Sequence, residues 1–208
     1  MRSFDRATSR LPRRWRIAID WLATIAAAIV VVLALEAEVA KPYRIPSESM
    51  EPTLLCARPG AGCEASMSDR VIACELCYRL GSPHRGQIVV FRAPAAAVSI
   101  CGAGGTYVKR LIGMPGNTIH EDDRSFIWID GRKLSEPYIS ASARTEDTRY
   151  RGQTWHVPQG EYFFMGDNRG NSCDSRAWGS VPRSSLIGPV VATYWPPTRL
   201  TLRLFDLS

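Results

Sequence analysis

Lysine and histidine are scarce in this chain of 208 residues. Of its 26 lysine and arginine residues only Lys41, Lys109 and Lys133 are lysine, and there are three histidines. Arginine stays protonated at any physiological pH, so few side chains can accept a proton near neutrality. The histidines and cysteines form no closed set of metal ligands, so we expect neither a metal site nor a cofactor.

Net positive charge is also scarce beyond the N-terminus. The net charge is +6, and the first sixteen residues alone carry +5. A basic tail can bind nucleic acid, but this one precedes an apolar run at 17–35 that only Asp20 and Thr24 interrupt. Nineteen residues at 1.5 Å each can cross a bilayer core of about 30 Å, and basic residues favour the cytoplasmic side. The pattern therefore predicts a membrane protein with no nucleic-acid partner.

The predicted organisation has three parts. Residues 1–16 form a cytoplasmic basic tail, 17–36 a transmembrane helix in the lipid bilayer of the cell membrane, and 37–208 an extracytoplasmic β-rich catalytic domain. A cleavable signal peptide is the alternative, since residues 34–40 include small side chains at suitable spacings. The apolar run is longer than the apolar region of a typical signal peptide, which favours the anchor.

Long helical patterns and internal repeats are absent after the apolar run. The 14 prolines and 16 glycines argue against long helices. Short β-branched or aromatic runs, separated by turn residues, predict a mainly β fold of antiparallel sheets. These runs are 71–72, 88–91, 107–112, 118–121, 126–129, 162–165 and 190–194, and the pair around 122–125 predicts a hairpin. The charged segment 136–152 is expected to be a surface loop or an insertion.

Ser49 and Lys109 are the candidate catalytic pair. Ser49 stands in PSESMEPTL and Lys109 in TYVKRLIGMPG. A serine hydroxyl attacks well only when a base removes its proton. The histidines lack a neighbouring acidic motif, Lys41 lies at the membrane exit, and Lys133 lies in an exposed hairpin, so Lys109 is left. It can act only if burial among apolar neighbours lowers its pKa from about 10.4 toward 7 or 8.

Four segments together resemble the boxes of type I bacterial signal peptidases. They are PSESMEPTL at 46–54, GQIVVF at 86–91, YVKRLIGMPG at 107–116 and MGDNRGNSCDSRAWGSVP at 165–182. The resemblance runs from 43 to 188 in the family's order. It implies a membrane-bound serine endopeptidase with a Ser/Lys dyad and the family's antiparallel catalytic domain. The implied substrates are signal peptides of exported preproteins, cut through an acyl-enzyme close to the secretion translocon.

The resemblance also implies roles for individual residues. Ser49 would be the nucleophile and Lys109 the general base, and the Ser47 hydroxyl would join the Ser49 amide in holding the oxyanion. Ser172 would hydrogen-bond the lysine amine, and Asp174 would pair with Arg176. Shallow pockets for small substrate residues, in the pattern A-x-A, would be lined by Ile45, Met50, Val90, Tyr107 and Val108.

A few positions depart from the family's pattern. The family often has Gly where this chain has Ser68, and Asp where it has Gln87 and Asn117. Glu48 stands between the two site serines and is expected to point to solvent, because a carboxylate near Lys109 would raise its pKa. Asp167 and Asn168 are expected to shape a turn.

Six cysteines in an extracytoplasmic domain permit disulfides. Cys56 and Cys63 bracket a short turn-rich loop and form the best local pair. Cys101 and Cys173 belong to segments expected to converge, since one precedes the Lys109 strand and the other adjoins Ser172. Cys74 and Cys77 form a CxxC motif without thioredoxin-like surroundings, which favours buried thiols or a local bridge.

Two other functions stay open. The chain could be another Ser/Lys processing peptidase, for example of the self-cleaving repressor type, although the apolar span argues against it. It could also be an inactive membrane-anchored binding protein. Cleavage of a general exported preprotein would distinguish a signal peptidase from another processing peptidase. Labelling of Ser49 by a serine-directed probe would distinguish an enzyme from an inactive binding protein.

Overall fold

The computed structural model describes residues 12–102 and 104–203, except for the side chains of 13, 16 and 31–39. The chain divides into two units, Met1–Val39 and Ala40–Ser208, which we describe separately. Most of the predicted tail 1–16 lies outside the described residues.

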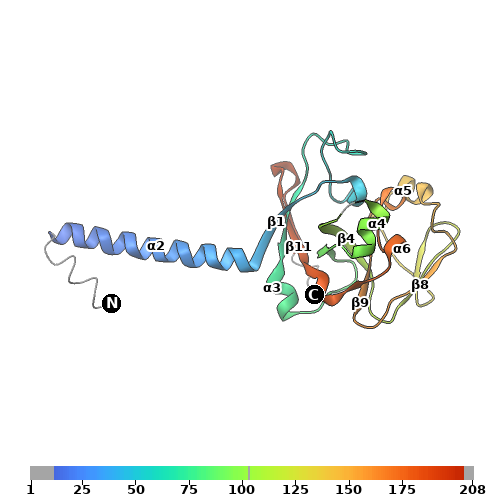
Figure 1. Cartoon of the computed structure of the whole chain (residues 1–208). Helices are drawn as coiled ribbons and strands as arrows, with labels where there is room; N and C mark the ends of the chain where they lie inside the picture. The colour runs from blue at the N-terminus through green and yellow to red at the C-terminus, as the bar shows by residue number, and fades with distance from the viewer. Residues whose placement is uncertain (1–11, 103, 204–208) are drawn as a thin grey trace. The chain divides into compact units, whose positions relative to one another are not determined.

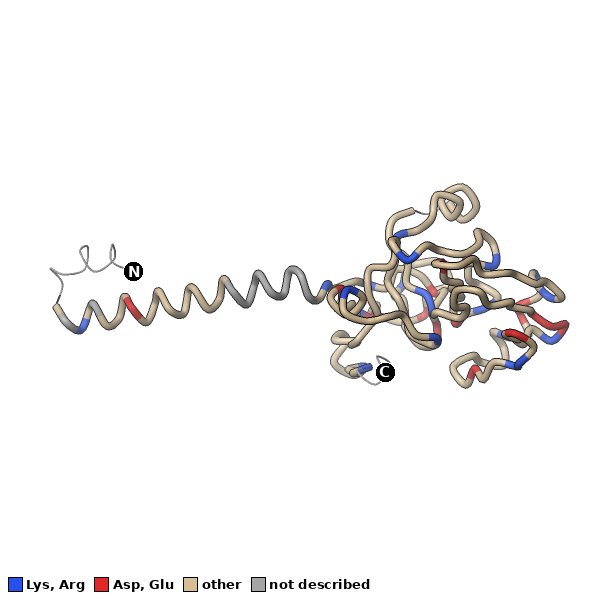
Figure 2. Tube along the Cα trace, turned by 90° about the horizontal axis from the view of Figure 1, so that it is seen from below, with Lys and Arg blue, Asp and Glu red and all other residues tan. Residues whose placement is uncertain are grey.

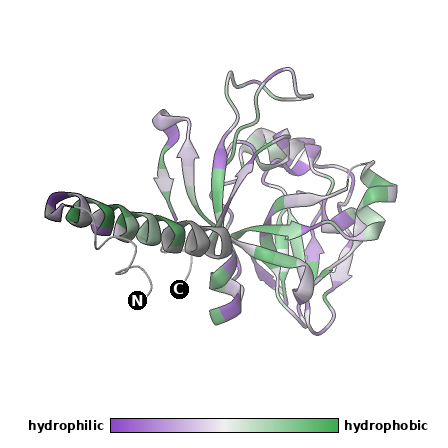
Figure 3. Cartoon of the chain, turned by 60° about the vertical axis from the view of Figure 1, so that its left-hand side comes forward, coloured by the Kyte–Doolittle hydropathy of each residue, from purple (hydrophilic) through white to green (hydrophobic). Residues whose placement is uncertain are grey.

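The first unit contains helix α2, Arg13–Val39. Its large apolar side chains, among them Trp21, Leu22, Ile25 and Val30, are exposed, and Figure 3 shows the hydrophobic colour along the helix. Figure 2 shows charge only toward the N-terminal end of its coloured part, where the sequence has Asp20. Taking the described residues alone, no helix has the length and apolar character needed to cross a membrane. Residues 31–36 of the predicted span lie outside the described side chains.

The second unit is built on two antiparallel sheets (Figure 1). The larger sheet has the order β1-β2-β11-β3-β4-β9-β10, with β12 paired to β11, and the smaller has the order β7-β6-β5-β8. The strands of the larger sheet are β1 Ala40–Arg44, β2 Arg70–Cys74, β3 Ile88–Arg92, β4 Thr106–Gly113, β9 Glu161–Met165, β10 Val181–Pro182, β11 Leu186–Trp195 and β12 Thr201–Leu202. Those of the smaller sheet are β5 Thr118–Glu121, β6 Ile127–Ile129, β7 Arg132–Lys133 and β8 Thr154–His156.

Short helices connect these strands. The α-helices are α3 Glu75–Leu80, α4 Ala95–Cys101, α5 Ala141–Glu146 and α6 Ser175–Trp178. Four single-turn 3-10 helices are η1 Glu48–Met50, η2 Arg169–Asn171, η3 Arg183–Ser185 and η4 Pro197–Arg199. The helices of this unit have at most seven residues, as the proline and glycine content predicts.

The sequence predicts the main strands correctly. All seven predicted runs fall within β2, β3, β4, β5, β6, β9 and β11, allowing one residue at the start of β6. The predicted hairpin is confirmed, because β5 and β6 pair antiparallel with Ile119 opposite Ile129. The sequence analysis missed β1, β7, β8, β10 and β12, which are short or mostly exposed and so lack a strong apolar pattern.

The prediction of a surface loop at 136–152 is wrong in part. The segment contains α5, and Glu136, Asp147 and Tyr150 are buried. Its acidic side chains can be buried because arginines pair with them: Arg169 with Glu136, and Arg176 with Asp147. A charged segment looks solvent-exposed in the sequence when its partners are distant along the chain.

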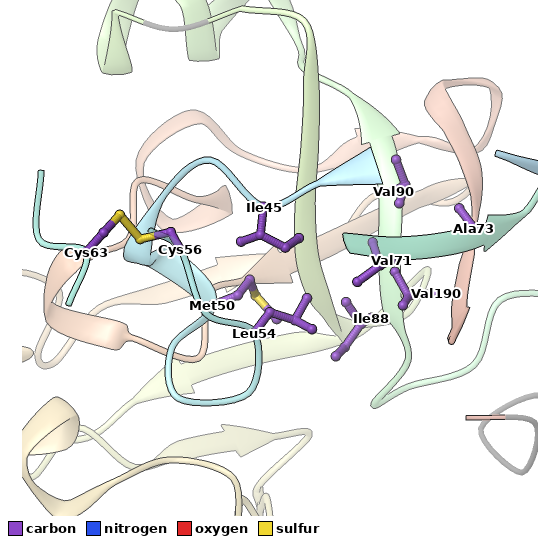
Figure 4. Close-up of a cluster of buried hydrophobic side chains, with 10 residues drawn as sticks. All are labelled: Ile45, Met50, Leu54, Cys56, Cys63, Val71, Ala73, Ile88, Val90 and Val190. Carbon is purple, nitrogen blue, oxygen red and sulfur yellow. A yellow bond between two sulfur atoms is a disulfide. The ribbon is translucent and has the colours of Figure 1, made fainter. Parts of the chain in front are cut away.

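Three apolar clusters fill the unit. One lies beneath η1, where Ile45, Met50 and Leu54 pack with side chains of β2, β3 and β11 and with the Cys56–Cys63 bridge (Figure 4). A second contains Phe91, Phe164 and Trp178, and a third lies between the sheets around Ile112 and Phe163. Strand β4 contributes Leu111 to the second cluster and Ile112 to the third, so it is held from both faces.

Candidate active site

Ser49 lies in η1, a single turn fixed to the core on both sides. Ile45 donates its amide to Asp69, and the Leu54 amide donates to the Met50 carbonyl, each at 2.9 Å. Ile45, Met50 and Leu54 are all almost completely buried. The Ser49 carbonyl accepts the Asn168 amide at 3.2 Å, which joins this turn to the segment 165–176. Packing and backbone hydrogen bonds thus hold Ser49 in place.

Lys109 lies on β4, opposite Val89 of β3. Only 5% of it is exposed, and its amine lies 5.9 Å from the centre of the Tyr107 ring. Among the described residues it makes no ion pair within 4 Å. A strand strongly fixed by its neighbours can bury a lysine in this way, whereas an isolated lysine would extend to water.

Burial is the largest influence on Lys109 and lowers the pKa of its amine to about 8. The charge of Asp174 opposes this shift, Arg176 reinforces it, and Asp167 opposes it. A substantial fraction of Lys109 is therefore neutral at pH 7 to 8 and can accept a proton. No such shift is available to an arginine at this position.

Ser49 and Lys109 line the same cavity, which has a volume of about 450 Å³. The Ser47 hydroxyl lies 3.2 Å from the Ser49 hydroxyl and lines the cavity as well. The sequence separates Ser49 and Lys109 by sixty residues. The structure brings together the three residues expected at the reacting centre, in a concave site with an apolar wall.

Four of the five expected substrate-binding residues line this cavity: Ile45, Met50, Tyr107 and Val108. Val90 does not line it, and is completely buried in the core cluster that also contains Ile45 and Met50. Val90 lies opposite Val108 in the pairing of β3 with β4, so the two side chains share one face of the sheet, and Val108 packs against the same cluster at its edge.

Asp174 and Arg176 form a buried pair at the start of α6. Nε and Nη2 of Arg176 donate hydrogen bonds to the carboxylate of Asp174, each at 2.9 Å, and the Gly166 amide donates to the same carboxylate at 3.0 Å. Burial raises the pKa of Asp174, but the charge and hydrogen bonds of Arg176 outweigh it, so the pKa lies below its ordinary value. An ordinary surface salt bridge does not describe this pair.

The hydrogen bond expected between Ser172 and Lys109 is not made in the structure. The Ser172 hydroxyl is buried and has no hydrogen-bond partner among the described residues. It lies against Gly166, where a Cβ atom would come within 2.3 Å of it. The close approach of Gly166 therefore determines where this hydroxyl sits.

The sequence analysis missed Arg110 and gave Asp167 too small a role. Asp167 does more than shape a turn: it is fully buried and accepts two hydrogen bonds from Arg110 and one from Thr53. Arg110 follows Lys109 on β4, so it points to the other face of the strand. A basic residue inside an otherwise apolar strand was the signal that could have identified it.

Glu48 does not point freely to solvent as expected. Its side chain is half-buried and lies against Gly62, where a Cβ atom would overlap the carboxyl group. Burial, and then the charges of Glu51 and Glu146, raises the pKa of Glu48. Glu48 is not among the groups that shift the pKa of Lys109. Its carboxyl group is thus held against Gly62 beside the cavity, which differs from the expected placement in solvent.

The residues at these departures from the family's pattern accept hydrogen bonds in turns, and none of the three lines the cavity of Ser49 and Lys109. The Ser68 hydroxyl accepts the Ala57 amide, and the Asn117 side chain accepts the Met114 amide. Gln87 accepts the Tyr78 hydroxyl at 2.9 Å and the His84 amide at 3.0 Å. A neutral amide oxygen thus accepts these hydrogen bonds without adding a buried charge.

The structure pairs all six cysteines. The bridges are Cys56–Cys63, Cys74–Cys77 and Cys101–Cys173, with Cα atoms 5.2, 5.4 and 6.1 Å apart. Cys101 and Cys173 line the cavity that Ser49 and Lys109 share. Within the described part of the chain, no group of three or more histidine, cysteine or acidic side chains could hold a metal ion.

Comparison with known proteins agrees with the motifs. Residues 18–195 match the family model described as signal peptidase, peptidase S26. The chain is 35% identical over 183 residues to a probable signal peptidase I-2 of Synechocystis, covering 88% of this chain and 76% of that protein. It is 33% identical over 192 residues to a probable signal peptidase I-1 of the same organism, covering 92% and 89%. A crystal structure of a signal peptidase I from Enterococcus faecalis is 33% identical and covers 53% of this chain and 97% of that chain, with a TM-score of 0.44.

Proposed function

This chain belongs to the signal peptidase family, peptidase S26, and on that premise we propose that it is a membrane-bound serine endopeptidase that removes N-terminal signal peptides from exported preproteins. The observation that carries the proposal is the buried amine of Lys109, with its pKa near 8, in one cavity with Ser49. A serine and a neutral lysine can together perform acyl transfer without a metal.

The proposed mechanism has two halves. Ser49 Oγ attacks the scissile carbonyl carbon while Lys109 Nζ takes its proton, and the Ser49 amide and the Ser47 hydroxyl donate to the oxyanion. Lys109 then returns the proton to the leaving amine, and the peptide C–N bond breaks to give an acyl-enzyme. In the second half Lys109 takes a proton from water, which attacks the ester, and Ser49 is released with its own proton restored.

The apolar wall of the cavity favours substrates with small side chains. Its wall is formed by Ile45, Met50, Tyr107 and Val108, which are already packed and leave shallow apolar space. We propose that this wall accepts small side chains at the first and third positions before the cleavage site. A preprotein with alanine at both positions should be cut, and replacing the alanine next to the bond by isoleucine should prevent cutting.

The test of the mechanism is cleavage of such a preprotein by the detergent-solubilised full chain. Ser49→Ala, Lys109→Ala and Lys109→Arg should each abolish cleavage, and the double variant should add almost nothing, since the two residues act as one unit. Lys133→Ala and Lys133→Arg are matched controls on the exposed strand β7. An active, folded Lys109→Arg variant would contradict the dyad, because guanidinium cannot take the proton.

Two alternatives are separated by the same material. A serine-directed probe should label Ser49 in the wild type and not in Lys109→Ala, whereas an inactive binding protein would react equally in both. A processing peptidase of narrower specificity would leave a general exported preprotein uncut while still reacting with the probe.

We also propose a single membrane span at 17–36 with the basic tail in the cytoplasm. The nineteen-residue apolar run and the exposed apolar side chains of α2 support it. Protease added to intact spheroplasts should digest the catalytic domain. Full protection in spheroplasts with digestion in inverted vesicles would show the opposite orientation.

A further inference from the structure

The guanidinium of Arg176 is shared by three carboxylates from three separate parts of the chain. Besides both oxygens of Asp174, it contacts Asp147 at 2.5 Å and Glu121 at 3.5 Å, both through Nη1. The side chains of all four residues are at most 1% exposed. Three anions around one cation leave excess negative charge in a dry interior, so one of the carboxyl groups is favoured to hold a proton.

Glu121 is the carboxyl group held most weakly. Its Oε1 atom is buried without a hydrogen-bond partner among the described residues, while Oε2 is the most distant of the Arg176 contacts. Burial, and then the charge of Asp147, raises the pKa of Glu121 to about 7, against the opposing charges of Arg176 and Arg169. Burial also raises the pKa of Asp147, although the charges of Arg176 and Arg169 act to lower it. Glu121 is therefore mostly charged by the pH at which Lys109 titrates.

The cluster is connected to the catalytic pair by contacts and by charge. Arg176 donates to the Arg169 carbonyl at 2.8 Å, and Asp174 accepts the Gly166 amide, so the segment carrying Ser172 is tied to it. Asp174 and Arg176 act on Lys109 in opposite directions, and Asp167 is the other charged group that acts on it. Asp174 and Arg176 are therefore the two members of the cluster whose charges reach Lys109.

On the basis of the function proposed above, we propose that Glu121 and Asp147 are positioning residues of the Ser49–Lys109 pair, acting on Lys109 through the guanidinium that they share with Asp174. Asp147 belongs to the segment 136–152 and Glu121 to β5 of the smaller sheet. The smaller sheet and this segment thus take part in setting the basicity of a lysine on the larger sheet.

The sign of the effect distinguishes this role from simple support of the fold. Glu121→Gln or Asp147→Asn removes a negative charge and leaves Arg176 less compensated, which should lower the pKa of Lys109. A loosened interior would instead admit water to Lys109 and raise its pKa toward the value of free lysine. The two mechanisms therefore predict opposite shifts.

The chain has three lysines, which makes the measurement direct. The full chain, labelled with isotopic lysine and kept in detergent micelles, should give three side-chain NMR signals, assigned with Lys41→Arg and Lys133→Arg. The pKa of Lys109 should fall on the order of half a unit in Glu121→Gln and in Asp147→Asn. Asp123→Asn, an exposed carboxylate two residues from Glu121, is the matched control and should leave it unchanged.

The pH profile of preprotein cleavage should move in parallel, with the rising limb of kcat/KM at lower pH in both variants. An unchanged or raised pKa of Lys109 in the folded variants would overturn the inference. If one of the two variants does not fold, the other still provides the test. If the wild type does not cut preproteins, the proposed function fails, whereas the lysine titration still decides whether Glu121 and Asp147 act on Lys109.

Discussion

The guanidinium of Arg110 donates to both carboxylate oxygens of Asp167, at 2.8 and 2.6 Å, in a site where Asp167 is completely buried. Arg110 and Lys109 are neighbours on β4 and point to opposite faces of the strand. The arginine has a buried carboxylate as its partner and stays charged. The lysine makes no ion pair among the described residues, and burial moves it toward its neutral form.

Asp167→Asn should destabilise the protein by about 3 to 5 kcal/mol, because it leaves the Arg110 charge buried without its partner. The free energy of unfolding in urea measures the change, and Asp123→Asn, at an exposed site, should cost less than about 0.5 kcal/mol. A change below about 1 kcal/mol in Asp167→Asn would mean that water or another carboxylate replaces the lost partner.

Cleavage should become faster as the pH rises through about 8, since only the neutral form of Lys109 accepts the proton of Ser49. Below that pH, kcat/KM should fall about tenfold per unit as the neutral fraction declines. The profile is measured on a preprotein with alanine at both recognition positions. A rising limb centred near the pKa of free lysine would show that the Lys109 amine is solvated in the working enzyme.

Ser47→Ala should lower kcat by about 10² to 10³, the typical cost of one oxyanion donor. The Ser47 hydroxyl lies 3.2 Å from that of Ser49, so its loss removes a donor beside the reacting centre. The rising limb of the pH profile should stay where it is, because Ser47 is not among the groups that shift Lys109. If the rising limb of the pH profile moved while the maximal rate stayed the same, Ser47 would instead take part in proton transfer.

Gly166→Ala should remove most of the cleavage activity in a protein that still folds. A Cβ atom at this position would lie 2.3 Å from the Ser49 carbonyl and from the Ser172 hydroxyl, so the turn that carries Ser49 has to shift. A displacement of about 1 Å at a reacting group can cost about 10² in rate. Circular dichroism checks folding, and a fully active variant would show that the segment 165–176 can move without displacing Ser49.

All three bridges should be present in protein isolated from the membrane without reductant. Peptide mapping should find Cys56 joined to Cys63 and Cys101 joined to Cys173, and the peptide containing Cys74 and Cys77 should lack the two thiol hydrogens. Bridges are expected because an extracytoplasmic domain meets an oxidising environment. Free thiols at all six positions would contradict the pairing, the orientation or both.

Local sequence already determined much of this protein. Seven of the strands, the β5–β6 hairpin and the scarcity of long helices follow from short β-branched runs separated by proline and glycine, a pattern that acts over a few residues. The candidate pair Ser49 and Lys109 followed from the shortage of other bases and from four motifs in order. Strand patterns, residue counts and the order of motifs are all properties of the linear sequence, so they can be read without knowing which segments lie opposite one another.

Only the tertiary structure decided which charged residues are buried and with which partners. Asp167 and Asp147 look like ordinary polar residues of a turn and a loop, and Glu121 like the polar end of a strand, yet each faces an arginine brought from a distant part of the chain. Val90, which was expected to line a substrate pocket, is completely buried and does not line the cavity, whereas Ile45 and Met50 of the same core cluster do. Burial and electrostatic pairing depend on how the sheets and loops come together, and the basicity of Lys109 depends on both.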